Sequence, residues 1–136
     1  MTDNLRIWLA NPLAIYTGNN EDASGGIVVS GKAIVELVAK GETPTNIDQT
    51  VDVSDQVLIP GLINTHHHFY QTLTRALPAA LNKELFPWLQ TLYPVWANLD
   101  PDVHRAATKL ALAELLLSGC TTASDHHYLF PANLTD

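Results

Sequence analysis

Three consecutive histidines, His66, His67 and His68, follow a short apolar segment that contains Pro60-Gly61. Side chains two residues apart on a strand project from the same face, so we expect His66 and His68 to point together and His67 to point away. Two imidazoles on one face can both approach a divalent ion at ~2.0–2.1 Å, the usual zinc–nitrogen distance. The spacing therefore predicts two ligands of a metal site at the end of a strand.

Clustered histidines also occur in expression tags, at surface positions and as hydrogen-bonded core residues. A tag does not fit, because tags lie at chain ends and this run follows the apolar residues 57–63, which read as a buried strand. Two ligands do not make a metal site, so spacing alone leaves metal binding and a structural role both open.

A second cluster lies at the end of another predicted strand, where residues 120–124 are followed by Asp125-His126-His127. A helical segment precedes it, and strand, helix and strand in this order are typical of an α/β protein with parallel strands. Ligands of such folds bind at the carboxyl ends of strands, and five of the six histidines lie at these two ends. By alternation we expect His127 to contact substrate, His126 to point elsewhere, and Asp125 to orient a histidine.

The elements that position these clusters differ along the chain. Short strands are predicted at 7–10, 13–16, 27–38 (two strands joined at Gly31) and 51–53. A helix is predicted to begin at Asp100-Pro101, with Asp100 as its N-cap, and to end at Gly119. His104 is expected to lie beside the apolar face of this helix, as a surface or partly buried structural residue. The apolar face is predicted to consist of Val103, Ala106, Ala107, Leu110, Ala113 and Leu117.

Residues 69–99 are rich in aromatic side chains and interrupted by prolines, which predicts an irregular excursion over the strand ends instead of one continuous helix. Trp88 and Trp96 are candidate walls of a pocket there. Gln71 lies three residues after His68, and its amide can both donate to and accept from the polar edge of a bound ring, although a surface position explains it equally well. Arg75 either contacts a substrate carbonyl or pairs with an acid.

Composition limits the class of protein. With 136 residues, of which 46% are hydrophobic and 15% charged, the chain is long enough and apolar enough for a packed core. Its net charge of −7 argues against a surface for nucleic acid or anionic membranes. The single cysteine, Cys120, cannot form an internal disulfide, and the first residues lack the layout of a signal peptide, so we expect a cytoplasmic protein.

The residues Pro60-Gly61-Leu62-Ile63-Asn64-Thr65-His66-His67-His68 resemble the first metal-binding motif of the amidohydrolase superfamily. Residues 69–75 and 125–131 resemble its branch of cytosine and guanine deaminases and chlorohydrolases, in particular bacterial 8-oxoguanine deaminases. The resemblance implies an α/β fold, the start of a (β/α)8 TIM-type barrel preceded by strands of a small β-sandwich domain. It places the N-terminal part of the sandwich at 1–58 and the first strands and helices of the barrel at 59–136.

The same resemblance implies that His66 and His68 bind one divalent metal, zinc or iron, whose other ligands and proton-transfer residues lie on later strands. The activity implied is hydrolytic deamination of a purine-like ring, with 8-oxoguanine giving urate and ammonia. Gln71 and His127, with Arg75, Trp88 and Trp96, are the candidate substrate contacts. We expect a homo-oligomer for the full-length enzyme, and an inactive fragment if these 136 residues stand alone.

The sequence leaves further functions open. Within the enzyme class they are a triazine hydrolase or chlorohydrolase, or a deaminase of guanine, cytosine or pterins. Outside it, the alternative is a non-catalytic metal-binding scaffold module that is complete at 136 residues.

Overall fold

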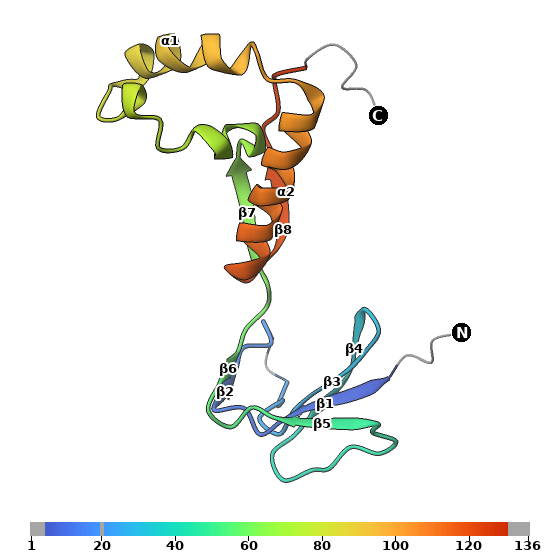
Figure 1. The fold of residues 1–136 in the computed structure, drawn as a ribbon. Helices are drawn as coiled ribbons and strands as arrows, with labels where there is room; N and C mark the ends of the chain where they lie inside the picture. Colours follow the sequence, from blue (N-terminus) through green and yellow to red (C-terminus); the bar gives the residue numbers. More distant parts are fainter. Residues whose placement is uncertain (1–4, 20, 131–136) are drawn as a thin grey trace. The chain divides into compact units, whose positions relative to one another are not determined.

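The computed structural model describes residues 5–19 and 21–130, and the chain divides into two compact units, Met1–Pro60 and Gly61–Asp136. Figure 1 shows strands in the first unit and mainly helices, with two strands, in the second. Each unit has its own architecture and is described separately.

Short strands make up the described part of the first unit. They are β1 (Arg6–Ala10), β2 (Ala14–Ile15), β3 (Gly26–Ser30), β4 (Ala33–Val38), β5 (Gln49–Asp52) and β6 (Val57–Leu58). Four of them form one sheet in the order β4-β3-β1-β5, while β2 and β6 form a separate parallel pair. β1 runs antiparallel to β3 and parallel to β5, which lies at the edge of the sheet.

The two predicted strands around Gly31 form the hairpin of β3 and β4. Gly31 has a φ of 58°, in the left-handed region that a tight turn requires and that glycine adopts without strain. Val28 and Val38, one from each strand, are 0% and 2% exposed and supply the buried side of the hairpin.

The second unit contains two strands connected by helices. Its elements are β7 (Leu62–His67), the 3-10 helices η1 (Phe69–Thr74) and η2 (Pro78–Ala80), the α-helices α1 (Leu85–Trp96) and α2 (Pro101–Leu117), and β8 (Cys120–Asp125). β7 and β8 pair in parallel, and α2 packs against η1 and β8. The predicted strand, helix and parallel strand are therefore confirmed (Figure 1).

Local signals in the sequence correctly predicted both ends of α2. The Asp100 carboxylate accepts the Val103 backbone N–H at 2.8 Å, and Pro101 occupies the first helical position, where its missing N–H costs nothing. Gly119, with a φ of 82°, follows the last turn and lets the chain reverse into β8.

The predicted apolar face of α2 was largely wrong, since only Ala107 of its six residues is buried. The buried residues are His104, Ala107 and Ala111, whereas Leu117 is 88% exposed. The expectation that His104 is a surface or partly buried residue was also wrong, because His104 is only 2% exposed. Small alanines let α2 approach its neighbours closely, whereas Leu110, Leu112, Leu116 and Leu117 are exposed.

The excursion between β7 and α2 is helical in three separate pieces, so the expectation that no continuous helix spans it is confirmed. α1 is longer than the prolines suggested, since Pro94 lies inside it near the C-terminal end. Leu92 and Trp96 of α1 form the hydrophobic cluster of this unit together with Tyr70 and Ala80.

Residues 57–63 do not form the predicted buried strand. Val57, Ile59 and Ile63 are 55%, 61% and 70% exposed, and the strand is interrupted between β6 and β7. Pro60-Gly61 causes this interruption, because proline lacks a ladder N–H, and the two units meet there in sequence. Among the described residues, no helix is long and apolar enough to cross a membrane.

Candidate active site

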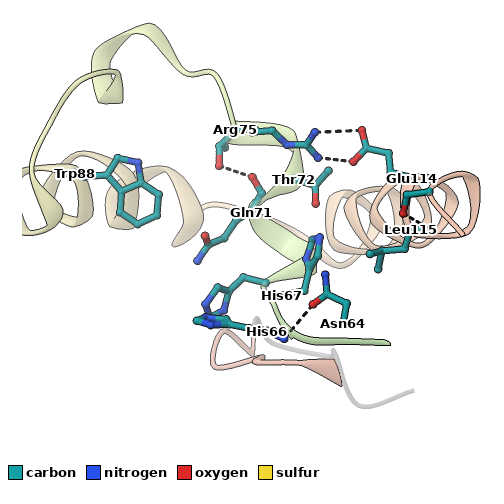
Figure 2. A pocket seen from close by; sticks show the side chains of 12 residues that line it. Asn64, His66, His67, Gln71, Thr72, Arg75, Trp88, Glu114 and Leu115 are labelled. Carbon is teal, nitrogen blue, oxygen red and sulfur yellow. Dashed lines mark hydrogen bonds and ion pairs between the residues drawn. The ribbon is translucent and has the colours of Figure 1, made fainter. Parts of the chain in front are cut away.

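The first histidine cluster lies at the carboxyl end of β7. The rings of His66 and His68 have centroids 5.3 Å apart, while the His67 ring contacts the Phe69 ring at 5.0 Å. In Figure 2 the His67 ring lies on the side of α2, apart from His66. Two imidazoles that bind one tetrahedral ion at ~2.0–2.1 Å have ring centres about 5 Å apart, so the spacing of His66 and His68 suits a shared ion.

His68 has a hydrogen-bond partner that fixes its usable nitrogen. Its Nδ1 lies 2.7 Å from the backbone carbonyl oxygen of His126, which can only accept, so Nδ1 carries the proton. The lone pair then remains on Nε2, the nitrogen available to a metal. The sequence alone did not identify this acceptor.

Within the described residues, no group of three or more His, Cys, Asp or Glu side chains is arranged to hold a metal ion. His66 and His68 fit two positions of a metal site by ring spacing and tautomer. Further ligands would have to come from elsewhere, as the sequence also led us to expect.

The second cluster has the reverse of the predicted orientation. The His126 ring stacks on His66 with centroids 4.8 Å apart, and its Nε2 lies 2.9 Å from the carbonyl oxygen of Thr65. His127 turns to the opposite face, where its ring packs against the rings of Tyr70 and His104 at 5.5 and 5.4 Å.

Strand register explains this reversal. β7 and β8 pair His67 with Asp125, and paired residues of neighbouring strands share a face. Asp125 and His127 therefore lie on the His67 side, and His126 lies on the side of His66. The expectation that His126 points elsewhere was wrong because one sequence does not reveal the register between two strands. The expectation that Asp125 orients a histidine is confirmed, since its Oδ2 lies 3.1 Å from Nδ1 of His127.

An open cavity of about 810 Å³ adjoins the first histidine cluster. Gln71 and Trp88, both predicted as substrate contacts, line it (Figure 2). The Gln71 Nε2 donates to the hydroxyls of Tyr70 and Tyr128, each at 3.1 Å, which leaves its Oε1 as an acceptor.

Arg75 also lines the cavity, but its guanidinium pairs with the carboxylate of Glu114 from α2 (Figure 2). This pairing raises the pKa of Arg75 and lowers that of Glu114. Of the two roles considered for Arg75, the structure has the pairing with an acid. Glu114 had no signal in the sequence that could have assigned it to this cavity.

Trp96 is not a pocket wall. It is 1% exposed within the hydrophobic cluster, and its Nε1 donates to Oγ1 of Thr74 at 3.0 Å. Trp88 lines the cavity and also packs against the hydrophobic cluster, with its ring centroid 5.4 Å from that of Trp96.

A buried group of titratable side chains lies behind the histidine pair. Burial raises the pKa of Tyr70, which is fully buried, and lowers the pKa of His104, with the neighbouring His127 adding to the second effect. Both ring nitrogens of His104 are buried without a hydrogen-bond partner in the described part of the chain. His104 is therefore held as a neutral imidazole.

Comparison with known proteins gives consistent results. The model of the amidohydrolase family matches residues 57–133. The 8-oxoguanine deaminase of Pseudomonas aeruginosa is 61% identical over 95% of this chain and 29% of its own length. An isoxanthopterin deaminase from an unknown prokaryotic organism is 35% identical over 90% of this chain and 27% of its own. The chain thus spans less than a third of these curated relatives.

Solved structures resemble it as well. A triazine hydrolase from Arthrobacter aurescens superposes with a TM-score of 0.82 at 28% identity, over 94% of this chain and 30% of the other. An adenosine deaminase from Xanthomonas campestris with bound zinc gives 0.69 at 27% identity, over 93% and 29%. Because the family model covers more than half of its residues, the chain belongs to the amidohydrolase family.

Proposed function

We propose that this chain contributes to a metal-dependent aminohydrolase that hydrolyses 8-oxoguanine to urate and ammonia. The observation that carries the substrate is the 61% identity to the Pseudomonas 8-oxoguanine deaminase over 95% of the chain. The ring spacing and the tautomer of the histidine pair support the metal. Zinc is the proposed ion, in keeping with the zinc-bound adenosine deaminase among the similar structures.

The proposed architecture follows from the positions of the histidines. β7 and β8 would be the first two strands of a (β/α)8 barrel, with residues 1–58 belonging to a β-sandwich domain. Both histidine clusters lie at the carboxyl ends of parallel strands, the end at which TIM-barrel enzymes carry their active sites.

In the proposed mechanism, His66 and His68 would hold the metal. Zinc held there would lower the pKa of a water towards ~7 and so make a hydroxide available at neutral pH. Gln71, held by two tyrosine hydroxyls, offers Oε1 to an N–H on the purine edge. Trp88 supplies a flat wall for the ring. Arg75, paired with Glu114, shapes the cavity and does not bind a substrate carbonyl in this mechanism.

The test is release of ammonia by the purified full-length protein loaded with zinc. We expect turnover of 8-oxoguanine, and a loss of more than ~100-fold in His66→Ala and in His68→Ala, because outer partners of ligands alone cost ~10–100-fold. Lys109→Ala, which removes an exposed side chain of α2, is the control and should retain activity.

Two outcomes would contradict the proposal. Turnover of isoxanthopterin or of a triazine without turnover of 8-oxoguanine would contradict the proposed substrate. It would favour the activity of another relative, such as the isoxanthopterin deaminase, which is 35% identical. Absence of turnover of any aminopurine, pterin or triazine by the metal-loaded protein would refute the enzyme and favour a scaffold module.

A further inference from the structure

The carboxylate of Asp125 links the ends of both strands of the second unit. Its Oδ1 accepts the backbone N–H of Phe69 at 2.9 Å, and its Oδ2 accepts Nδ1–H of His127 at 3.1 Å. Phe69 directly follows His68, so one side chain holds the turn after β7 and the chain after β8 together. The Asp125 side chain is 22% exposed, and the two hydrogen bonds are partly shielded from water.

The peptide of His126 lies between the two residues that this carboxylate holds. Its N–H donates to the carbonyl of His67 at 2.8 Å, and its carbonyl accepts Nδ1–H of His68 at 2.7 Å. The direction of this carbonyl depends on the backbone from Asp125 to His127. The hydrogen bond between the side chains of Asp125 and His127 closes residues 125–127 into a short loop.

The ring of His127 is itself fixed by packing. It contacts the rings of Tyr70, His104 and Phe130 at 5.5, 5.4 and 5.0 Å. Because its neighbours hold the ring, the hydrogen bond from Nδ1 restrains the carboxylate as well as the loop. This part of the network lies on the opposite face of β8 from the histidine pair.

We propose that Asp125 is a positioning residue for the histidine pair, which acts through His127 and the carbonyl of His126 to hold His68 with its proton on Nδ1. This inference rests on the proposed function, because it concerns the nitrogen that His68 presents to a metal. Asp125 touches neither the metal nor the substrate in this role. Partners of this kind affect metal affinity by ~10–100-fold.

Two variants of the full-length protein test the proposal. Asp125→Asn keeps an oxygen for the Phe69 N–H but faces His127 with an amide N–H₂ in place of an acceptor. His127→Phe keeps an aromatic ring among Tyr70, His104 and Phe130 and removes the donor to Asp125, together with Nε2, which is buried without a hydrogen-bond partner in the described part of the chain. Asp100→Ala is the matched control, because Asp100 also accepts one backbone N–H, from Val103 at 2.8 Å, but at the start of α2.

The measurements are zinc affinity by competition with a chelator, the visible spectrum of the cobalt-substituted protein, and the melting temperature of the apoprotein. We expect both site variants to raise the zinc Kd at least ~10-fold and to alter the cobalt spectrum. His127→Phe should leave the melting temperature of the apoprotein close to that of the parent. Asp100→Ala should lower the melting temperature and leave the zinc Kd unchanged.

A zinc Kd and cobalt spectrum equal to those of the parent in folded His127→Phe and Asp125→Asn would overturn the positioning role. If only one variant folds, its Kd decides. Failure of the parent protein itself to bind zinc or cobalt would instead refute the metal in the proposed function. The two failures are therefore distinguishable.

Discussion

The stability of the protein at acid pH should depend on the environment of the buried His104 side chain. Burial favours the neutral imidazole and lowers the pKa of His104, and the nearby carboxylates of Asp100 and Asp125 only partly oppose this effect. The unfolded chain has the ordinary pKa of about 6.5. Between the folded pKa and 6.5 the unfolded chain binds more protons, so the free energy of unfolding falls as the pH falls below about 6.5.

His104→Phe should remove this contribution. In the part of the chain that the structure describes, both ring nitrogens of His104 are buried without a hydrogen-bond partner. Phenylalanine puts an apolar ring of similar shape in their place. Removing an unsatisfied buried polar group should stabilise the folded state by about 1–3 kcal/mol. Fitting a slightly larger ring into a packed site offsets part of this stabilisation. We therefore expect an unchanged or higher free energy of unfolding at pH 7.5, and a smaller decrease between pH 7.5 and 5.

The assay is urea unfolding of the apoprotein followed by tryptophan fluorescence, with a chelator present so that metal release does not add its own pH dependence. Trp96 reports on the relevant region, since its ring and that of His104 both contact Tyr70. A loss of more than about 1 kcal/mol at pH 7.5, with the decrease towards pH 5 retained, would refute the reasoning. It would mean that His104 makes a stabilising hydrogen bond, for example to an internal water.

Three further predictions concern packing and capping. A Cβ on Gly61 would clash with the side chain of Thr121, so Gly61→Ala should cost about 1–3 kcal/mol in urea unfolding, and adding Thr121→Ala should restore part of it. Trp96→Ala should cost about 3–5 kcal/mol, whereas Trp88→Ala, which removes a half-buried ring packed against the same cluster, should cost less and also raise the KM for substrate; equal losses of stability would contradict their assignment to core and cavity. Asp100→Ala should cost about 1 kcal/mol in thermal or urea unfolding, and Asp100→Asn should recover most of it, since both Asp and Asn are good N-caps; no recovery would argue against the cap.

Local signals in the sequence predicted the elements whose chemistry is local. The ends of α2 depend on Asp100, Pro101 and Gly119, each of which acts on its own backbone or that of the next turn, and each is where the sequence placed it. The hairpin around Gly31 follows the same logic. The spacing of His66 and His68 also depends only on alternation along one strand.

Features that depend on contacts between distant segments were not predictable in this way. Which face of α2 is buried depends on how closely η1 and β8 approach, and alanines at 107 and 111 allow an approach that leucines would prevent. The pairing of Arg75 with Glu114 joins residues 39 apart in the sequence, and no local pattern marks it.

The register between β7 and β8 has the largest consequence for the site. With His67 paired to Asp125, the carboxylate and the His127 ring lie behind the histidine pair, while the His126 ring lies beside it. A shift of one residue would exchange these faces, because the side-chain period of a strand is two. It would also move the His126 carbonyl away from Nδ1 of His68. The three consecutive residues Asp125, His126 and His127 therefore work together only in this register, with a carboxylate behind the strand, a carbonyl at its end and an imidazole packed against Tyr70 and His104.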